Sequence, residues 1–291
     1  MSDEHPNGTL LVPVANVETV DRLMDTAIDV AGDQSLGVTV IHVVEVPAQI
    51  PLSEGSRLVD DEDQVLVKHA ERKGKDAGIP VDTRIRLARD VATGIVGAAR
   101  EHEANTILLG WRGRPPRKNI ILGSYVDRVL QKAPCDVLVK RIRTDTEAID
   151  SVLVPVASGA HTELAAKTAA SIARRHDARV LLLHVLPSDP SDSDRASGSE
   201  LLRNARAQFD GVSEVAVELG ESDHVSGAIT DASENFAVTV LGVTEQSLLR
   251  RKLLGTVSEG VGRHAEGTVI LARRHLSKTS RLRQLLDAIV Q

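Results

Sequence analysis

The stretch that decides the fold is Leu10-Leu-Val-Pro-Val-Ala15, because it returns almost unchanged as Val152-Leu-Val-Pro-Val-Ala157. The pair His42-Val43 returns as His184-Val185 at the same offset of 142 residues. Further on, Gly123-Ser124 returns as Gly255-Thr256. Self-similarity at a long, fixed offset indicates a duplicated structural unit. A length of 291 residues also suits two domains of about 150 residues each.

Within each half, short apolar runs alternate with segments of helical periodicity. Most of the apolar runs lack strict alternation with polar residues, which is typical of strands buried on both faces. In the first half the strands are expected at Leu10–Val14, Gly37–Val44, Val81–Leu87, Thr106–Leu109 and Asp136–Lys140. Helices are expected around Val20–Ala31 and at Asp61–Ala77, Val91–His102 and Ser124–Ala133.

This alternation predicts an α/β fold of two tandem doubly wound domains, each a five-stranded parallel sheet with helices on both faces. The domains are expected at residues 8–142 and 150–274, followed by a C-terminal helix at 275–291. The segment Ser188–Ser199 is rich in Ser, Asp and Pro and is expected to be a loop.

Composition excludes several classes of function. A net charge of −6 argues against a nucleic-acid partner, since phosphate backbones are bound through clustered Lys and Arg. No apolar run reaches the roughly 18 residues of a membrane helix, and the polar start of the chain is unlike a signal peptide. We therefore expect a cytoplasmic protein that is not an integral membrane protein. The single cysteine, Cys135, adjoins an apolar run and is expected to be a core thiol.

The strongest functional signal is Gly110-Trp-Arg-Gly113, followed by Gly123-Ser124. It lies directly after the strand-like run Thr106–Leu109 and directly before the helical run Tyr125–Ala133. Glycines allow close backbone approach to a ligand, and a helix start offers unpaired N–H groups to a phosphate. The pattern therefore predicts a phosphate-binding loop. The alternative is a tight turn that only lets a strand and a helix pack.

Other candidate sites are weaker. His42 and His184 match between the halves, but neither has a second metal ligand at a suitable spacing, so a strand-end role is expected and no metal site is predicted. Ser124 has no identifiable base beside it, which argues against a nucleophile. No catalytic residues are assigned.

The glycine spacing after a fourth strand, together with Leu-Val-Pro-Val at the first strand, resembles the universal stress protein family. The resemblance covers almost the whole chain, as a tandem member. It implies binding of ATP, with or without Mg²⁺, no established catalytic activity, and assembly as dimers. It would place the phosphates on Gly110, Gly113, Gly123 and Ser124, with a further backbone N–H from Tyr125. The adenine would lie against Val14 and Val43.

Two departures weaken that implication. ATP-binding members of the family carry Asp just after the first strand, where this chain has Ala15 and Ala157. In the second half Glu245 replaces a motif glycine and would place a carboxylate where phosphate would go. The second half is therefore interpreted as degenerate, and binding is expected in the first half.

The sequence around Pro51-Leu-Ser-Glu-Gly55 and Gly110-Trp-Arg-Gly113 also resembles tandem stress-protein domains attached to some archaeal amino-acid or cation transporters. Three functions follow. The first is an ATP-binding regulatory or stress-response protein that is not an enzyme. The second is a nucleotide-independent interaction module that regulates a membrane transporter. The third is a slow ATPase or phosphotransferase.

The duplication also carries an expectation about assembly. The last strands of the two halves, Val137–Val139 and Thr268–Leu271, are apolar, and an unpaired apolar edge invites association. We expect them to pair edge to edge, so that the chain is an intramolecular pseudo-dimer. A homodimer of whole chains is the further possibility.

Overall fold

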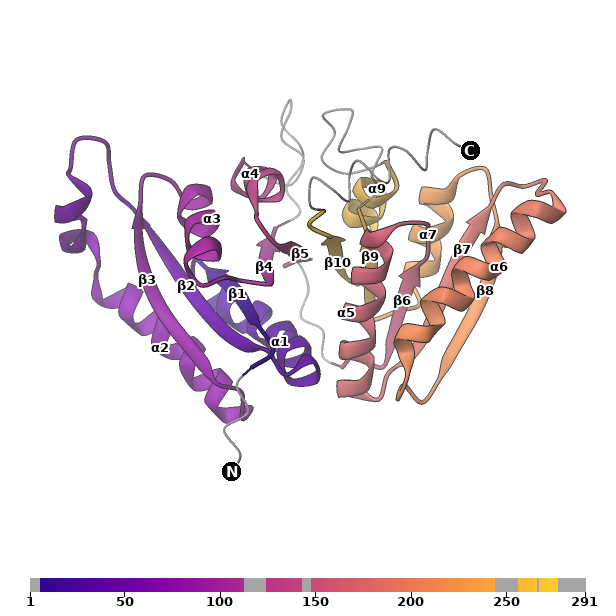
Figure 1. Ribbon diagram of the computed structural model, residues 1–291, viewed down its shortest axis with the longest axis horizontal. Coiled ribbons are helices and arrows are strands. Elements are labelled where there is room, and N and C mark those ends of the chain that lie inside the picture. The colour runs from indigo at the N-terminus through magenta and orange to yellow at the C-terminus, as the bar shows by residue number, and fades with distance from the viewer. Residues whose placement is uncertain (1–5, 113–123, 143–147, 244–255, 266, 277–291) are drawn as a thin grey trace.

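The computed structural model describes residues 6–112, 124–142, 148–243, 256–265 and 267–276. These residues form one sheet of ten strands, in the order β3-β2-β1-β4-β5-β10-β9-β6-β7-β8 (Figure 1). In the first half the strands are β1 (Thr9–Val14), β2 (Gly37–Glu45), β3 (Val81–Ala88), β4 (Thr106–Trp111) and β5 (Asp136–Arg141). In the second half they are β6 (Ser151–Pro155), β7 (Arg179–Leu186), β8 (Val215–Glu221), β9 (Val238–Gly242) and β10 (Thr268–Arg273).

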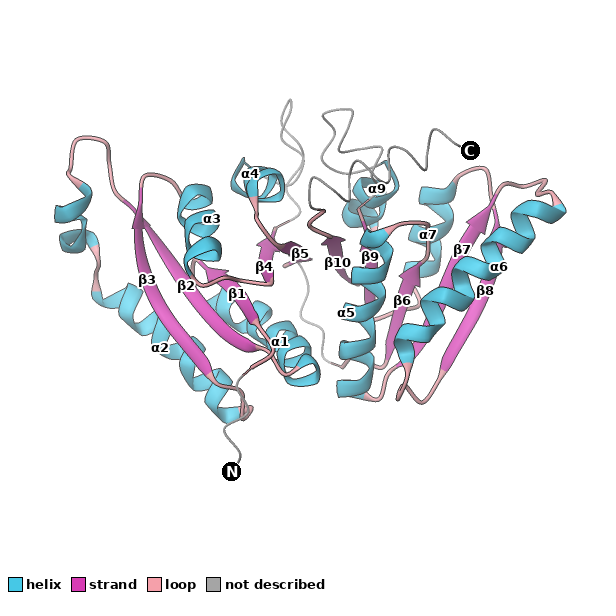
Figure 2. Cartoon of the chain, viewed as in Figure 1, coloured by secondary structure: helices cyan, strands magenta, loops and turns pink. Residues whose placement is uncertain are grey.

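Each half is the expected doubly wound unit, since its five strands are parallel and run in the same order in both halves. One face of the sheet is covered by α1 (Val17–Gln34), α2 (Asp61–Asp76), α5 (Ala160–His176) and α6 (Asp192–Arg206). The other face is covered by α3 (Val91–Glu101), α4 (Ser124–Lys132), α7 (Val225–Ser233) and α9 (Thr256–His264). Figure 2 shows these layers, with short 3₁₀ turns at η1 (Leu52–Leu58) and η2 (Ala207–Phe209).

The start of α6 corrects the loop expected at Ser188–Ser199. Ser191 caps this helix with its side chain, and the Asp194 carboxylate accepts a hydrogen bond from the Ser191 backbone N–H in return. Such a reciprocal capping box satisfies N–H groups that a helix start leaves unpaired. The Ser and Asp residues that suggested a loop are therefore the signal of a helix N-terminus.

The two halves are joined through β5 and β10, which pair antiparallel with Val139 opposite Leu271 and Leu138 opposite Ala272. This confirms the expected edge-to-edge pairing of the last strands. Both hydrophobic layers continue across the seam, because each contains buried residues from the two halves. The intramolecular pseudo-dimer is thus one continuous packed body rather than two beads on a linker.

Two buried arginines lock the seam from opposite sides. Arg141 at the end of β5 is 2% exposed and donates to the Gly262 carbonyl at 2.9 Å, to the Gly267 carbonyl at 2.5 Å, and to the Ala265 carbonyl. At the matching position of β10, Arg273 is 4% exposed and donates to the Cys135 carbonyl at 3.2 Å. The end of a helix carries partial negative charge on its last carbonyls, so a cation there is stabilised. Arg141 therefore caps the end of α9 in the other half, and Arg273 bonds to the segment between α4 and β5.

Helices α1 and α5 add a polar contact across the same seam. Arg174 donates to both carboxylate oxygens of Asp33 at 2.7 Å, and this bidentate pairing lowers the pKa of the Asp33 carboxyl. His176 lies 3.0 Å from Asp29, whose pKa is raised by burial. The Gln34 amide donates to the Ser171 hydroxyl at 3.0 Å. These contacts fix the two long helices against each other.

Replacing Arg141 with Met should destabilise the protein by about 3 kcal/mol or more, because three buried carbonyls lose a charged donor. Urea unfolding followed by circular dichroism measures the change. The matched control is Arg100→Met, at an exposed position of α3, where a change within about 0.5 kcal/mol is expected. Equal unfolding midpoints for the two variants would show that Arg141 does not lock the seam.

Candidate functional site

The strand order reverses at β1 and β4, and in doubly wound sheets the ligand-binding crevice lies outside the carboxyl ends of the strands at this point. The two strands pair only at Leu10 with Thr106 and at Leu11 with Ile107. The Thr9 N–H donates to the side chain of Asn105, just before β4, and the Thr9 carbonyl accepts from the Asn105 N–H. The backbone groups of alternate strand residues point to the same side, so those of Pro13 also face β4. Proline has no N–H to donate, so the ladder cannot continue there. Ligands of doubly wound sheets bind at such reversal points.

Helix α1 starts directly behind this crevice. Asn16 caps it by accepting hydrogen bonds from the Thr19 backbone N–H at 2.9 Å and the Thr19 hydroxyl at 2.7 Å. Ala15, which stands where a nucleoside-binding Asp was expected, is exposed at the same edge. The polar side chain at the end of β1 is thus engaged in capping.

The structure places the predicted binding residues around this edge of the sheet. Val14 ends β1 and its side chain is buried under α1, whereas Val43 on the neighbouring β2 packs toward α3. Ser124 is the first residue of α4, and Tyr125 donates from its hydroxyl to the Gly110 carbonyl at 2.8 Å. Burial raises the pKa of that hydroxyl. Gly113 and Gly123 lie outside the described residues, so their phosphate contacts stay a prediction.

Gly110 has a packing reason to be glycine. A Cβ built on it would lie 2.1 Å from Cδ1 of Ile142, so the side chain of Ile142 fills the space. Gly110 is the next-to-last residue of β4. Core packing against Ile142 explains why this residue is a glycine, while its proposed contact with a ligand remains a prediction.

The matched histidines tie the strand ends together, as expected for a strand-end role. Nδ1 of His42 donates to the Val14 carbonyl at 3.0 Å, and His184 makes the same bond to the Val156 carbonyl at 2.8 Å. In the first half, Nε2 of His42 also lies 2.8 Å from Asp63 in the first turn of α2. Asp63 was not predicted from the sequence as a partner of His42, although its position at the start of the helix that follows β2 places it at the same edge of the sheet.

Charged groups flank the crevice on both sides. Arg112, just after β4, lies 3.3 Å from Glu18 in the first turn of α1. Across α3 and α4, Arg128 lies 2.8 Å from Asp90, the N-cap of α3. Within the described part of the chain no three His, Cys, Asp or Glu side chains group as a metal site would require. Cys135 is buried, and burial raises the pKa of its thiol to about 12, so it is a core thiol as expected.

At the corresponding edge of the second half the neighbour of the strand glycine is backbone rather than a side chain. A Cβ on Gly242, the equivalent of Gly110, would lie 2.7 Å from the carbonyl carbon of His161 in the first turn of α5. His161 is 3% exposed, and its Nδ1 accepts a hydrogen bond from the Arg274 backbone N–H at 2.8 Å. Burial, together with the nearby Arg273, lowers the pKa of His161 to about 4. A neutral, enclosed imidazole therefore lies where α5 meets the end of β9.

Comparison with known proteins identifies the class. The family model described as the universal stress protein family matches residues 6–141 and 148–273. The chain belongs to this family, as two tandem copies of its domain. No helix among the described residues has both the length and the apolar character needed to cross a bilayer.

Two sequence relatives illustrate the range of the family. A universal stress protein of Methanocaldococcus jannaschii is 32% identical over 136 residues, covering 45% of this chain and 79% of the relative. The Na(+)/H(+) antiporter NhaS5 of Synechocystis is 24% identical over 267 residues, covering 90% of this chain. This chain spans only 38% of that antiporter's length.

Two solved structures share the tandem fold. A universal stress protein from Archaeoglobus fulgidus superposes with a TM-score of 0.68 at 19% identity, over 92% of this chain and 97% of that one. The cytoplasmic domain of a prokaryotic cation chloride cotransporter superposes with a TM-score of 0.61 at 11% identity, over 92% and 95% of the two chains. At these identities the likeness concerns the fold alone.

Substituting alanine for each of the two equivalent glycines should give unequal costs. At Gly110 the obstacle is the flexible end of the Ile142 side chain, so Gly110→Ala should cost about 1 kcal/mol. At Gly242 the obstacle is backbone of α5, so Gly242→Ala should cost about 3 kcal/mol. Chemical unfolding of both variants measures the difference. A larger cost at Gly110 would contradict the packing described here.

The buried His161 should make stability depend on pH. Its pKa in the folded protein, about 4, lies below its ordinary value of about 6.5, so the unfolded chain binds the proton more readily. The stabilising contribution is full above about pH 6.5 and is lost as pH falls toward 4. Between pH 7 and pH 5, wild type should lose about 2 kcal/mol more than His161→Gln. Parallel pH profiles of unfolding free energy would refute this assignment.

Proposed function

We propose that the first half of the chain binds an adenine nucleotide, ATP, in the crevice between the carboxyl ends of β1 and β4. The observation that carries this proposal is where the glycine pattern falls. It runs from Gly110 at the end of β4 to Ser124 at the start of α4, at the point where the strand order reverses. A helix N-terminus at such a point suits a phosphate through its free N–H groups and its dipole.

The described residues fit a nucleotide in part. Ser124 begins α4, so the N–H groups of Ser124 and Tyr125 belong to the helix turn that lacks intrahelical partners. Val43, half-buried on β2, would offer an apolar wall to the base, and Val14 would contribute backbone, since its side chain is enclosed. Gly113 and Gly123 would complete the phosphate contacts by their spacing in the sequence. Mg²⁺ would arrive with the triphosphate.

The missing carboxylate at Ala15 sets an expectation for affinity. An Asp there would accept hydrogen bonds from the nucleoside, and an alanine methyl group cannot. Binding is therefore expected to rest on the phosphate end of the ligand. The second half would not share it, because Glu245 brings a carboxylate and the start of α5 packs closely on Gly242.

The described residues support a regulatory role better than a catalytic one. None of the described residues at the crevice pairs a nucleophile with a base, and the acids there are engaged: Glu18 pairs with Arg112, and Asp63 with His42. Occupancy of the crevice would be the signal, which a protein partner reads as part of a stress response. The rival proposal of a slow ATPase or phosphotransferase predicts release of phosphate on incubation with ATP and Mg²⁺.

Replacing Gly113 with Glu should copy the second half and weaken ATP binding at least about tenfold, roughly 1.4 kcal/mol, because like charges would meet at the phosphates. Isothermal titration calorimetry on the full chain measures the affinity. The matched control is Val217→Glu, which adds the same charge at an exposed position of β8, far from the crevice. Equal affinity in Gly113→Glu and the control would overturn the placement of the phosphates.

A second candidate function is regulation of a membrane transporter without any nucleotide. The observation that favours it is the similarity to the Na(+)/H(+) antiporter, which extends over 90% of this chain. The fold shared with the cytoplasmic domain of a cation chloride cotransporter points the same way. The absence of Asp at both strand ends, at Ala15 and Ala157, also fits a module that has lost its ligand. A folded wild-type chain without measurable affinity for ATP would favour this function over the first.

A further inference from the structure

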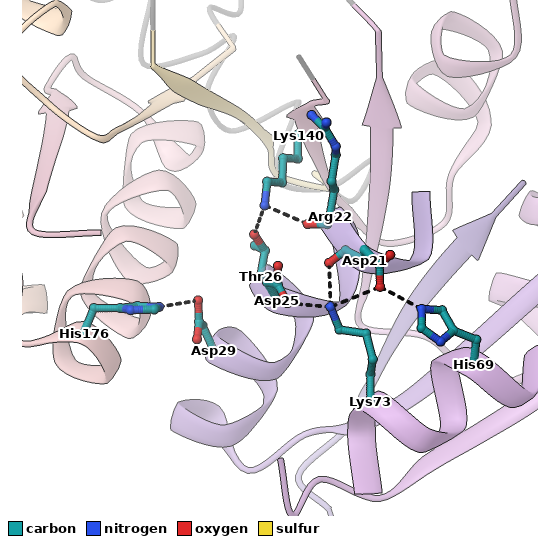
Figure 3. A network of polar contacts seen from close by, with 9 residues as sticks. All are labelled: Asp21, Arg22, Asp25, Thr26, Asp29, His69, Lys73, Lys140 and His176. Carbon is teal, nitrogen blue, oxygen red and sulfur yellow. Dashed lines mark hydrogen bonds and ion pairs between the residues drawn. The ribbon is translucent and has the colours of Figure 1, made fainter. Parts of the chain in front are cut away.

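A separate, partly open cavity of about 320 Å³ lies at the seam, lined by α1, α5 and the paired strands. Figure 3 shows polar side chains of its lining and their neighbours. Its charged lining includes Lys140 from β5, Asp29 from α1 and His176 from α5. Its apolar lining includes Ile149, Ile172 and Ile270. The volume is at the small end of the range for ligand sites, about 300–1,000 Å³. The cavity is distinct from the crevice between β1 and β4.

Lys140 reaches into the cavity from the middle of the sheet. Its ammonium donates to the Arg22 carbonyl at 2.7 Å and to the Thr26 hydroxyl at 2.9 Å. An ammonium has three donors, so these two bonds leave it capacity for one more acceptor. Burial lowers the pKa of Lys140 to about 8, although Asp25 and Asp29 both favour its charged form.

Groups of the opposite sign line the other side. Asp29 is 6% exposed and holds His176 through one carboxylate oxygen at 3.0 Å, while burial raises its pKa. Asp25 stands one helical turn earlier, mostly exposed, 2.9 Å from Lys73 of α2. In Figure 3 Lys140 points toward Thr26 and the Arg22 carbonyl, and Asp29 points toward His176; both residues line the cavity. The cavity thus offers a cation and a carboxylate together.

The pseudo-twofold relation of the halves shows that this charge is not a requirement of the fold. The position equivalent to Lys140 is the fully buried Ala272. The pair His176 and Asp29 is matched by Gln34 and Ser171, which make a hydrogen bond of 3.0 Å, and the Ser171 hydroxyl also donates to Asp33 at 2.8 Å. Since alanine serves the same packing in the other half, the buried ammonium of Lys140 needs another reason.

We propose that this cavity binds a small zwitterion, an aliphatic α-amino acid. Its carboxylate would accept from Lys140, its ammonium would lie against Asp29, and its side chain would pack on the isoleucines. A simple anion would face Asp25 and Asp29, and a simple cation would face Lys140, Arg22 and Arg141. Only a ligand that carries both charges close together complements the lining, and the apolar wall selects an aliphatic body.

Calorimetry on the full chain tests the proposal with L-leucine, L-isoleucine and L-valine. Two analogues separate the charges: 4-methylpentanoate lacks the ammonium, and isopentylamine lacks the carboxylate. At least one amino acid should bind at least tenfold more tightly than its single-charge analogues. Binding of 4-methylpentanoate as tight as that of leucine would make this an anion site and overturn the proposal. Absence of heat with all three amino acids would do the same.

Variants locate the binding. Lys140→Met keeps the length of the side chain and should weaken the amino acid at least tenfold, whereas Lys167→Met, at an exposed lysine of α5 on the mirror side, should leave affinity unchanged. His176→Gln copies the neutral mirror contact and should also weaken binding, which keeps the test decisive if Lys140→Met fails to fold. Unchanged affinity in His176→Gln and in folded Lys140→Met would place the ligand elsewhere and refute the site.

Discussion

The antiparallel pairing of β5 with β10 is the interaction on which the rest of this structure depends. Without it each half would end in an apolar strand with unpaired N–H and carbonyl groups, a surface that invites association. Pairing turns two five-stranded sheets into one sheet of ten strands and joins the hydrophobic layers on both faces. The buried Arg141 and Arg273 then donate to backbone carbonyls of the opposite half.

The same chain order that builds each half also opens its crevice. β1 and β4 start as neighbours and part before Pro13, whose missing N–H faces β4. The strand-end histidine ties β1 to β2 at that level, and in the first half Asp63 extends the tie to α2. In the second half the first turn of α5 packs closely on Gly242. The shared fold thus packs a side chain on Gly110 and helix backbone on Gly242.

Fusing two family domains in one chain permits differences that a symmetric dimer cannot have. In a homodimer with twofold symmetry, every residue at the interface occurs twice in equivalent surroundings. Here the position of Lys140 is taken by Ala272 in the other half, and the positions of Asp29 and His176 are taken by Ser171 and Gln34. The seam is therefore symmetric in backbone and asymmetric in charge. This asymmetry is what gives the cavity beside Lys140 its mixed lining.

The sequence by itself determined the duplication, the α/β class and the strands of the first half, because these are read from periodicity and repetition along the chain. The apolar character of the two last strands also led to the correct prediction that they pair. The sequence also indicated that Cys135 is a core thiol and that the matched histidines lie at strand ends. It misassigned the start of α6, since a capping box and a polar loop share their composition and differ only in how Ser191 and Asp194 meet. Tertiary structure alone decided that Gly110 makes room for Ile142, that Asp63 reaches His42, and that Lys140 and Asp29 line one cavity together with His176 of the other half. Those contacts join residues far apart in the sequence, and only the packing of distant elements brings them within reach.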